Sequence, residues 1–240
     1  MEVITRRDLV KNSAVAAAAV AAGTAVPAAA SDSTNAGGAV GRMKIIAICC
    51  SPRKGKSTAA CLRICLDAAK EVSRKIDVEL IELAGKQIPG SLAAGVPLEP
   101  GQKDDFPKLV PRLSDPSVAG IIIGTPVYFG NMSSLCKAFL DRCIVLWQDN
   151  LALGNKVAGV LAVGGSRNGG QELTIQSVHT SLLCQQMIVV GNGQPGPRLG
   201  GTVWSGANGG ATGDEFGMAT VRSLGRRVAE VALRLSGIVA

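Results

Sequence analysis

The stretch KIIAICCSPRKGKST, residues 44–58, decides the fold that we expect. It begins with a short apolar run, Lys44–Cys49, which predicts a buried β-strand. It ends in Ser57 and Thr58, hydroxyl residues that are typical of a helix N-terminus. The turn between them carries basic side chains and bare backbone N–H groups. A strand, a cationic turn and a helix start in this order are suited to binding a phosphate group.

The rest of the chain repeats this alternation of short apolar runs with helical periods, which is typical of a parallel sheet covered by helices. The predicted strands are Lys44–Cys49, Asp77–Leu83, Ala119–Gly124, Lys156–Val163 and Met187–Val190. The predicted helices are Thr58–Ser73, Phe106–Leu113, Ser133–Trp147, Gln171–Leu183 and Phe216–Leu235. We therefore expect an α/β fold, a doubly wound five-stranded parallel sheet with helices on both faces. Two long Gly- and Pro-rich loops, residues 84–105 and 191–214, are expected to help build a site.

Composition limits the class of protein. The 240 residues are 47% hydrophobic and 18% charged, which excludes disorder and favours one globular domain. The net charge is +7, but the basic residues are scattered and aromatic residues make up 3% of the chain, so no nucleic-acid partner is expected. The seven cysteines lack the clustering of a zinc or iron–sulfur site, and no metal is expected. For His179, the only histidine, a surface or capping role is favoured over proton transfer.

The N-terminal residues 1–30 have the order of parts of a twin-arginine signal peptide. Arg6 and Arg7 precede a short Ala- and Val-rich run and an Ala-Ala-Ala sequence before Ser31. We expect export to the periplasm, no stable membrane span, and a linker over residues 31–42. The alternative is an amphipathic N-terminal tail on a cytoplasmic protein. Because this route commonly exports proteins that fold first around a cofactor, it also predicts a tightly held cofactor.

Two further turns follow strands that neighbour the first strand in such a sheet, where ligands of open α/β sheets bind. In residues 125–132, Tyr128 and Phe129 precede Gly130, a combination that suits a flat aromatic ligand, with capping of the core as the alternative. Residues 164–170 form a Gly-rich, donor-rich turn for which a plain glycine loop is the alternative.

Two nucleotide-binding motifs are matched only in part. Residues 50–57 resemble the end of a P-loop, but no carboxylate follows the third or fourth strand to hold Mg²⁺, so a P-loop nucleotide-binding protein is the lesser alternative. Gly191, Gly193 and Gly196 have the spacing of a dinucleotide fingerprint. Pro195 and Pro197 exclude the helix that must begin there.

Taken together, these turns resemble those of the flavodoxin-like NAD(P)H-dependent FMN reductases, particularly the tryptophan-repressor-binding-protein type of NAD(P)H:quinone oxidoreductase. The resemblance covers residues 43–236 and includes Lys137–Asp141 and the segment Leu146-Trp147, whose Trp faces the ring in the family. Lys56 and Ser57 stand where the family usually has Gly and Asn, and Cys184 and Gln185 occupy a stretch where quinone-reducing relatives carry a His.

The resemblance and the three turns imply FMN as cofactor, within a domain over residues 43–240. The candidate cofactor-binding residues are Ser51, Arg53, Lys56, Ser57, Thr58, Pro126, Val127, Tyr128, Phe129, Gly130, Asn131, Trp147, Gly164, Gly165, Ser166, Gly169 and Gly170. The implied function is electron transfer from NAD(P)H, or from a redox-protein donor, to a small acceptor such as a quinone or free flavin, and no side chain need act as catalyst. A homodimer or homotetramer is also implied. The alternative is a non-catalytic FMN-binding electron carrier.

Overall fold

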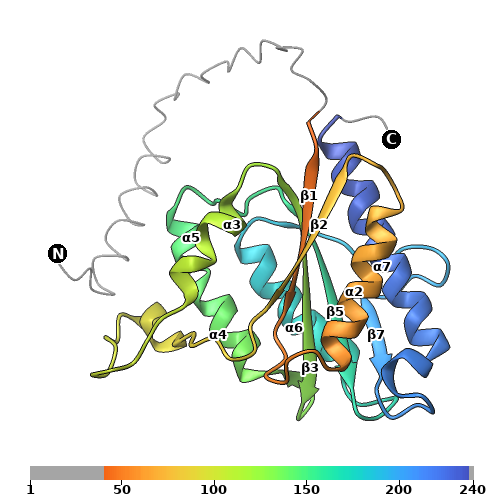
Figure 1. Ribbon diagram of the computed structural model, residues 1–240, viewed down its shortest axis with the longest axis horizontal. Coiled ribbons are helices and arrows are strands. Elements are labelled where there is room, and N and C mark those ends of the chain that lie inside the picture. The colour runs from red at the N-terminus through yellow and green to blue at the C-terminus, as the bar shows by residue number, and fades with distance from the viewer. Residues whose placement is uncertain (1–40, 238–240) are drawn as a thin grey trace, which may run out of the picture. The chain divides into compact units, whose positions relative to one another are not determined.

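The computed structural model describes residues 41–237, and these form the expected parallel sheet with helices on both faces (Figure 1). Its main strands follow the order β2-β1-β3-β5-β6, and every neighbouring pair along this path is parallel. The strands are β1 (Met43–Cys49), β2 (Ile76–Glu82), β3 (Val118–Tyr128), β5 (Val157–Gly164) and β6 (Ile188–Val189). The carboxyl ends of β1, β3 and β5 therefore lie side by side, as the prediction requires.

Two short strands were not predicted. β4 (Asn131–Met132) pairs antiparallel with the end of β3, so β3 continues beyond Gly124 into a hairpin. β7 (Gly201–Trp204) pairs in parallel with the second half of β5 and lies within the segment 191–214, which was expected to be a loop. The fifth strand position is thus divided between β6 and β7, with residues 190–200 forming an excursion between them.

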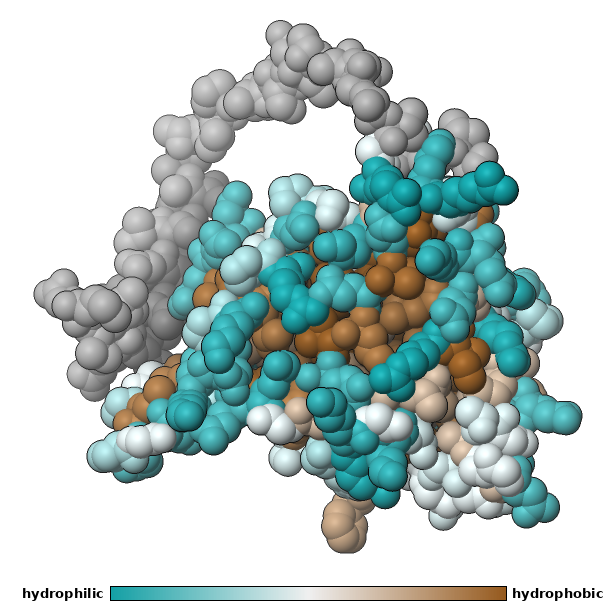
Figure 2. Space-filling view, in the orientation of Figure 1, coloured by the Kyte–Doolittle hydropathy of each residue, from teal (hydrophilic) through white to brown (hydrophobic). Residues whose placement is uncertain are grey.

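The helices cover the sheet in two groups, which are separated by the strands in Figure 1. On one face α2 and α7 pack on each other and on a core that includes Leu62, Ile122 and Val228. On the other face α3, α4, α5 and α6 pack on a second core that includes Phe106 and Phe139. The helices are α2 (Ser57–Lys70), α3 (Val110–Ser114), α4 (Ser134–Arg142), α5 (Ile144–Gln148), α6 (Gln171–Cys184) and α7 (Glu215–Leu235). In the same orientation, Figure 2 shows hydrophobic residues toward the middle of the visible face and hydrophilic residues around them.

The excursion over residues 84–105 is anchored to α4. It contains the 3₁₀-helix η1 (Gly90–Ala94), which packs on α4, and leads into a second, η2 (Phe106–Lys108). Arg142 makes a buried ion pair of 2.8 Å with Asp104, and its guanidinium lies 5.0 Å from the ring centroid of Phe106. Both charges are largely removed from water. Because either charge left alone there would be strongly destabilising, the pair fixes the path of the excursion.

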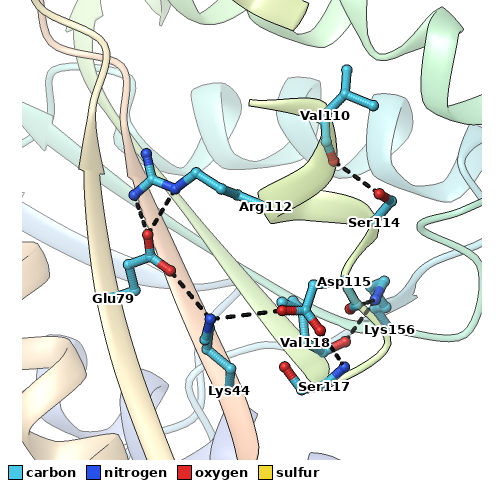
Figure 3. A network of polar contacts seen from close by, with 9 residues as sticks. All are labelled: Lys44, Glu79, Val110, Arg112, Ser114, Asp115, Ser117, Val118 and Lys156. Carbon is cyan, nitrogen blue, oxygen red and sulfur yellow. Dashed lines mark hydrogen bonds and ion pairs between the residues drawn. The ribbon is translucent and has the colours of Figure 1, made fainter. Parts of the chain in front are cut away.

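A polar network ties the strands together near their amino ends, away from the three turns (Figure 3). The side chain of Lys44 lies between the carboxylates of Glu79 and Asp115, at 3.7 and 3.8 Å, and Arg112 donates hydrogen bonds to Glu79. Lys156 donates to the backbone carbonyl oxygen of Val118 at 2.7 Å, and burial lowers its pKa. The network connects β1, β2, α3 and the segments that lead into β3 and β5.

The predicted signal segment, residues 1–30, lies outside the described residues, as does nearly all of the predicted linker. Within residues 41–237, no helix is both long and apolar enough to cross a membrane.

Candidate functional site

The first turn presents the N-terminus of α2 beyond the end of β1. Ser51 is buried, and its hydroxyl accepts a hydrogen bond from the N–H of Arg53 at 3.2 Å, which shapes the turn. Lys56 is the N-cap residue, no side chain caps the helix, and its first turn has no acidic residue. The first N–H groups of α2, beginning at Ser57, therefore remain available to an anion at the positive end of the helix dipole.

Glu82, which the sequence reasoning missed, shapes the same turn. Its carboxylate accepts a hydrogen bond from the N–H of Gly55 at 2.7 Å and pairs with Arg63 at 3.0 Å. Gly55 has a positive φ of 67°, a conformation that favours glycine. Because Glu82 occupies the Gly55 N–H, a phosphate is directed to the start of α2. Glu82 ends β2, the strand next to β1, and that position is the signal that was overlooked.

The second turn is the tip of the β3–β4 hairpin. Phe129 and Gly130 both have positive φ, 49° and 74°, as in the two-residue turns that join twisted antiparallel strands. A left-handed conformation at a residue with a side chain costs roughly 1–2 kcal/mol. Phe129 is fully exposed and Tyr128 is 42% exposed, so neither ring is enclosed in the core. The alternative in which these rings cap the core is therefore wrong for Phe129.

Buried hydroxyl groups tie the first turn to the second. The Ser133 hydroxyl donates a hydrogen bond to the carbonyl oxygen of Cys50 at 2.7 Å. The Ser133 Oγ atom also accepts a hydrogen bond from the N–H of Cys136 at 3.1 Å, which caps α4. The hydroxyl of Thr125 accepts from the N–H of Ser133 at 3.1 Å and donates to the carbonyl of Pro126 at 3.0 Å. These bonds hold the two turns in one fixed relation, as a preformed site requires.

The third turn, residues 164–170, is folded by Gln171. Its amide donates to the carbonyl oxygens of Ser166 and Val203, at 2.7 and 3.3 Å, and accepts from the N–H of Gly169 at 2.9 Å. Gly170 has a φ of 92°, and a Cβ atom added there would lie 2.9 Å from the Cα of Gly130. The third turn therefore touches the tip of the second.

Open space lies beside the backbone at one glycine of each turn. A Cβ atom added at Gly55, Gly130 or Gly165 would have no neighbour within 4 Å. Ligand atoms can therefore approach these backbones closely, while the uncapped start of α2 offers donors to a phosphate. A phosphate at the first turn and a flat ring between the second and third fit this arrangement, which is the placement that the resemblance implies for FMN.

The structure brings together every candidate residue except one. Residues 51–58, 126–131 and 164–170 lie at or just beyond the carboxyl ends of the neighbouring strands β1, β3 and β5. Trp147 lies on α5, which follows α4 and is near α3 at the opposite end of the sheet (Figure 1). Within one chain Trp147 therefore lies apart from the three turns, and its predicted place against the ring does not arise from the fold of a single chain.

Six cysteines and the Nε2 atom of His179 are buried, and Cys184 is exposed. All seven cysteines are free thiols. Burial raises the pKa of Cys49 to about 11 and that of Cys61 to about 12, which keeps both protonated at neutral pH. Burial also lowers the pKa of His179, whose Nε2 has no partner in the described chain. Within residues 41–237, no group of three or more His, Cys, Asp or Glu side chains could hold a metal ion.

Comparison with known sequences gives consistent matches. Residues 43–196 match the model of a family described as NADPH-dependent FMN reductase. An iron-sulfur flavoprotein of Methanocaldococcus jannaschii is 40% identical over 192 residues, which are 79% of this chain and 97% of the relative. An NAD(P)H dehydrogenase (quinone) of Chromohalobacter salexigens is 34% identical over 176 residues, which are 67% of this chain and 84% of the relative.

Solved structures share the fold at lower identity. A WrbA-like flavodoxin from Agrobacterium tumefaciens superimposes with a TM-score of 0.54 at 21% identity, and the match covers 80% of this chain and 98% of the other. RosB, solved with a bound riboflavin-phosphate intermediate, gives a TM-score of 0.64 at 15% identity, with 81% of each chain covered. These likenesses confirm the flavodoxin-like fold.

Proposed function

The chain belongs to the NADPH-dependent FMN reductase family, and from that premise we propose that its three turns bind FMN and pass electrons from NAD(P)H, or another reduced donor, to a small acceptor. The observation that carries the proposal is the meeting of an uncapped helix N-terminus with two glycine-containing turns at neighbouring strand ends. A quinone or free flavin is the proposed acceptor, and a homodimer or homotetramer remains a prediction.

Bound FMN supplies the redox chemistry, because its ring accepts a hydride and releases electrons. The residues of the chain bind and orient it. The start of α2 and the ammonium group of Lys56 hold the phosphate, while Phe129, Gly130 and the backbone of residues 164–170 form the walls beside the ring. No side chain of this site is required to act as an acid or a base.

The iron–sulfur cluster in the name of some relatives is not part of this proposal. Such a cluster needs several cysteine thiolates around one point. All seven cysteines lie within the described residues, where six are buried and no metal-binding group of three occurs. We propose that FMN alone carries the electrons. The names of those relatives also fit the alternative of an electron carrier. A carrier differs from an enzyme in one measurable property, because it does not consume NADH or NADPH in the steady state.

We expect the purified protein to be yellow and to release FMN on denaturation. The first turn offers a site for one terminal phosphate, and the described residues contain no second domain for an adenosine group. Mass analysis of the released molecule identifies the flavin, and visible spectra before and after addition of NADPH report reduction. Release of FAD, or of a nucleoside triphosphate with Mg²⁺, would contradict the proposal.

We expect Lys56→Glu to weaken FMN binding by at least about 1.5–3 kcal/mol, the size of a charge-assisted hydrogen bond. The substitution replaces an attractive charge at the start of α2 by a repulsive one. The dissociation constant of the reconstituted protein measures the effect. Lys103→Glu makes the same charge change in the excursion before α3 and serves as the control. Equal affinity in Lys56→Glu and the parent protein would place the phosphate elsewhere.

Export by the twin-arginine route completes the proposal. The order of parts in residues 1–30 supports it, and a cofactor-loaded domain that folds before export is consistent with it.

A further inference from the structure

A cavity of about 470 Å³ adjoins the third turn on the side away from the first. The third turn contributes Arg167 and Gly170 to the lining of the cavity, and the excursion before β7 contributes Arg198. Trp204 from β7 and Phe216 from α7 complete the part of the lining that matters here. Its size lies in the range of small-molecule sites. Arg167, Asn168 and Gly170 of the third turn line this cavity, and Gly170 also contacts Gly130, so the cavity adjoins the proposed flavin site and shares the wall that this turn forms.

Two guanidinium groups in this cavity are each held over an aromatic ring. The Cζ atom of Arg167 lies 4.7 Å from the centroid of Trp204, and that of Arg198 lies 5.8 Å from the centroid of Phe216. Stacking on a ring holds the planar guanidinium in place with its N–H donors at the edge. Arg198 donates from Nη1 to the carbonyl oxygen of Pro197 at 3.1 Å, and its other N–H groups are available to a ligand. Phe216 is 55% exposed, so part of its ring remains available to an apolar ligand face.

The acidic groups of the cavity neutralise only part of this charge. Asp214 is buried, accepts a hydrogen bond from the N–H of Trp204 at 2.8 Å, and lies 3.9 Å from Arg167. Glu172 is exposed in the first turn of α6, where the helix dipole favours a negative charge. Among the described residues, no carboxylate lies within ion-pair distance of Arg198, whose charge is therefore available to an anion.

We infer that this cavity binds an aromatic molecule that carries an anionic group, with its ring beside Trp204 or Phe216 and its anion on Arg198 and Arg167. Guanidinium groups beside the exposed ring of Phe216 and the half-buried ring of Trp204 combine the two features that such a molecule needs. Two sources share this chemistry: the phosphorylated adenosine of a reduced dinucleotide donor, and an acidic aromatic acceptor such as a sulfonated quinone. The role of the bound molecule, as donor or acceptor, rests on the proposed function. Its binding does not, because binding can be measured without turnover.

Isothermal titration of the FMN-loaded full-length protein tests the inference with two charged probes and their neutral counterparts. Adenosine 2′,5′-bisphosphate is compared with adenosine, and anthraquinone-2-sulfonate with 2-hydroxymethylanthraquinone. At least one charged probe is expected to bind at least about tenfold more tightly than its neutral counterpart. Binding of the nucleotide assigns the cavity to a donor, and binding of the sulfonate assigns it to an acceptor.

Variants then locate the binding. Arg198→Gln and Arg167→Gln are each expected to weaken the charged probe at least about tenfold, and Glu172→Gln to strengthen it, because a repulsive charge is removed. Arg234→Gln, in the last turn of α7 and outside the cavity, is the matched control. The inference is overturned if neither charged probe binds more tightly than its neutral counterpart, or if Arg198→Gln and Arg234→Gln behave alike. Normal FMN content and NADPH oxidation alongside such a result would leave the proposed function intact.

Discussion

Replacing Gly225 by alanine is expected to destabilise the protein by about 1–3 kcal/mol, the usual effect of overpacking a well-packed interface. Gly225 lies within α7 where that helix crosses α2, and a Cβ atom added there would be 1.9 Å from the carbonyl oxygen of Cys65. The contact is with backbone, so no side-chain rotation relieves it. Helix propensity alone predicts the opposite sign, because alanine in a helix interior is favoured over glycine by about 1 kcal/mol.

Chemical and thermal denaturation show whether Gly225→Ala lowers or raises the stability of the protein. Ala219 is exposed on the same helix, and Ala219→Gly measures the propensity effect without the clash. We expect both substitutions to lower the unfolding midpoint, whereas propensity alone would raise it for Gly225→Ala. A higher midpoint for Gly225→Ala would show that the two helices separate at little cost. Because the start of α2 faces the proposed phosphate, displacement of α2 is also expected to weaken FMN binding.

Much of the sheet and its helices could be predicted because each element carries a local signal. Apolar runs such as Lys44–Cys49 fall on strands, and the period of residues 216–235 falls on α7 within one residue. β7 was not predicted because it has only four residues and lies between glycine- and proline-rich segments. It is defined by its pairing with β5. A strand defined by a distant partner has little pattern of its own.

The site was predictable in its turns and less so in its supporting residues. The cationic turn and the aromatic turn are readable because unusual residue types gather after a strand. Glu82 and Gln171 act by hydrogen bonds to the N–H groups of Gly55 and Gly169. The position of Glu82 at the end of a strand next to β1 was available from the sequence, but the partner of each side chain was not. Trp147 was assigned through the resemblance alone. It lies on α5, which begins directly after the end of α4, whereas Ser133 at the start of α4 bonds to the first turn.

Changing both Arg6 and Arg7 to lysine is expected to abolish export and leave the protein in the cytoplasm. The substitution keeps the positive charge, so a signal that needs only charge would survive it, whereas a twin-arginine signal would not. Cell fractionation measures the distribution, and N-terminal sequencing of the exported form is expected to begin near Ser31. Arg42→Lys, beyond the predicted signal, makes the same chemical change and should leave export intact.

The outcome also bears on the electron donor. If the parent protein and the double variant both remain in the cytoplasm with Met1 in place, residues 1–30 are a tail and soluble NAD(P)H is an ample donor. If the parent protein is exported, soluble nicotinamides are scarce around it, so a redox protein or a membrane quinol becomes the favoured donor. An acidic aromatic acceptor would then be the favoured occupant of the cavity beside Arg198, and NADPH oxidation in vitro would report the chemistry of the flavin rather than the natural partner.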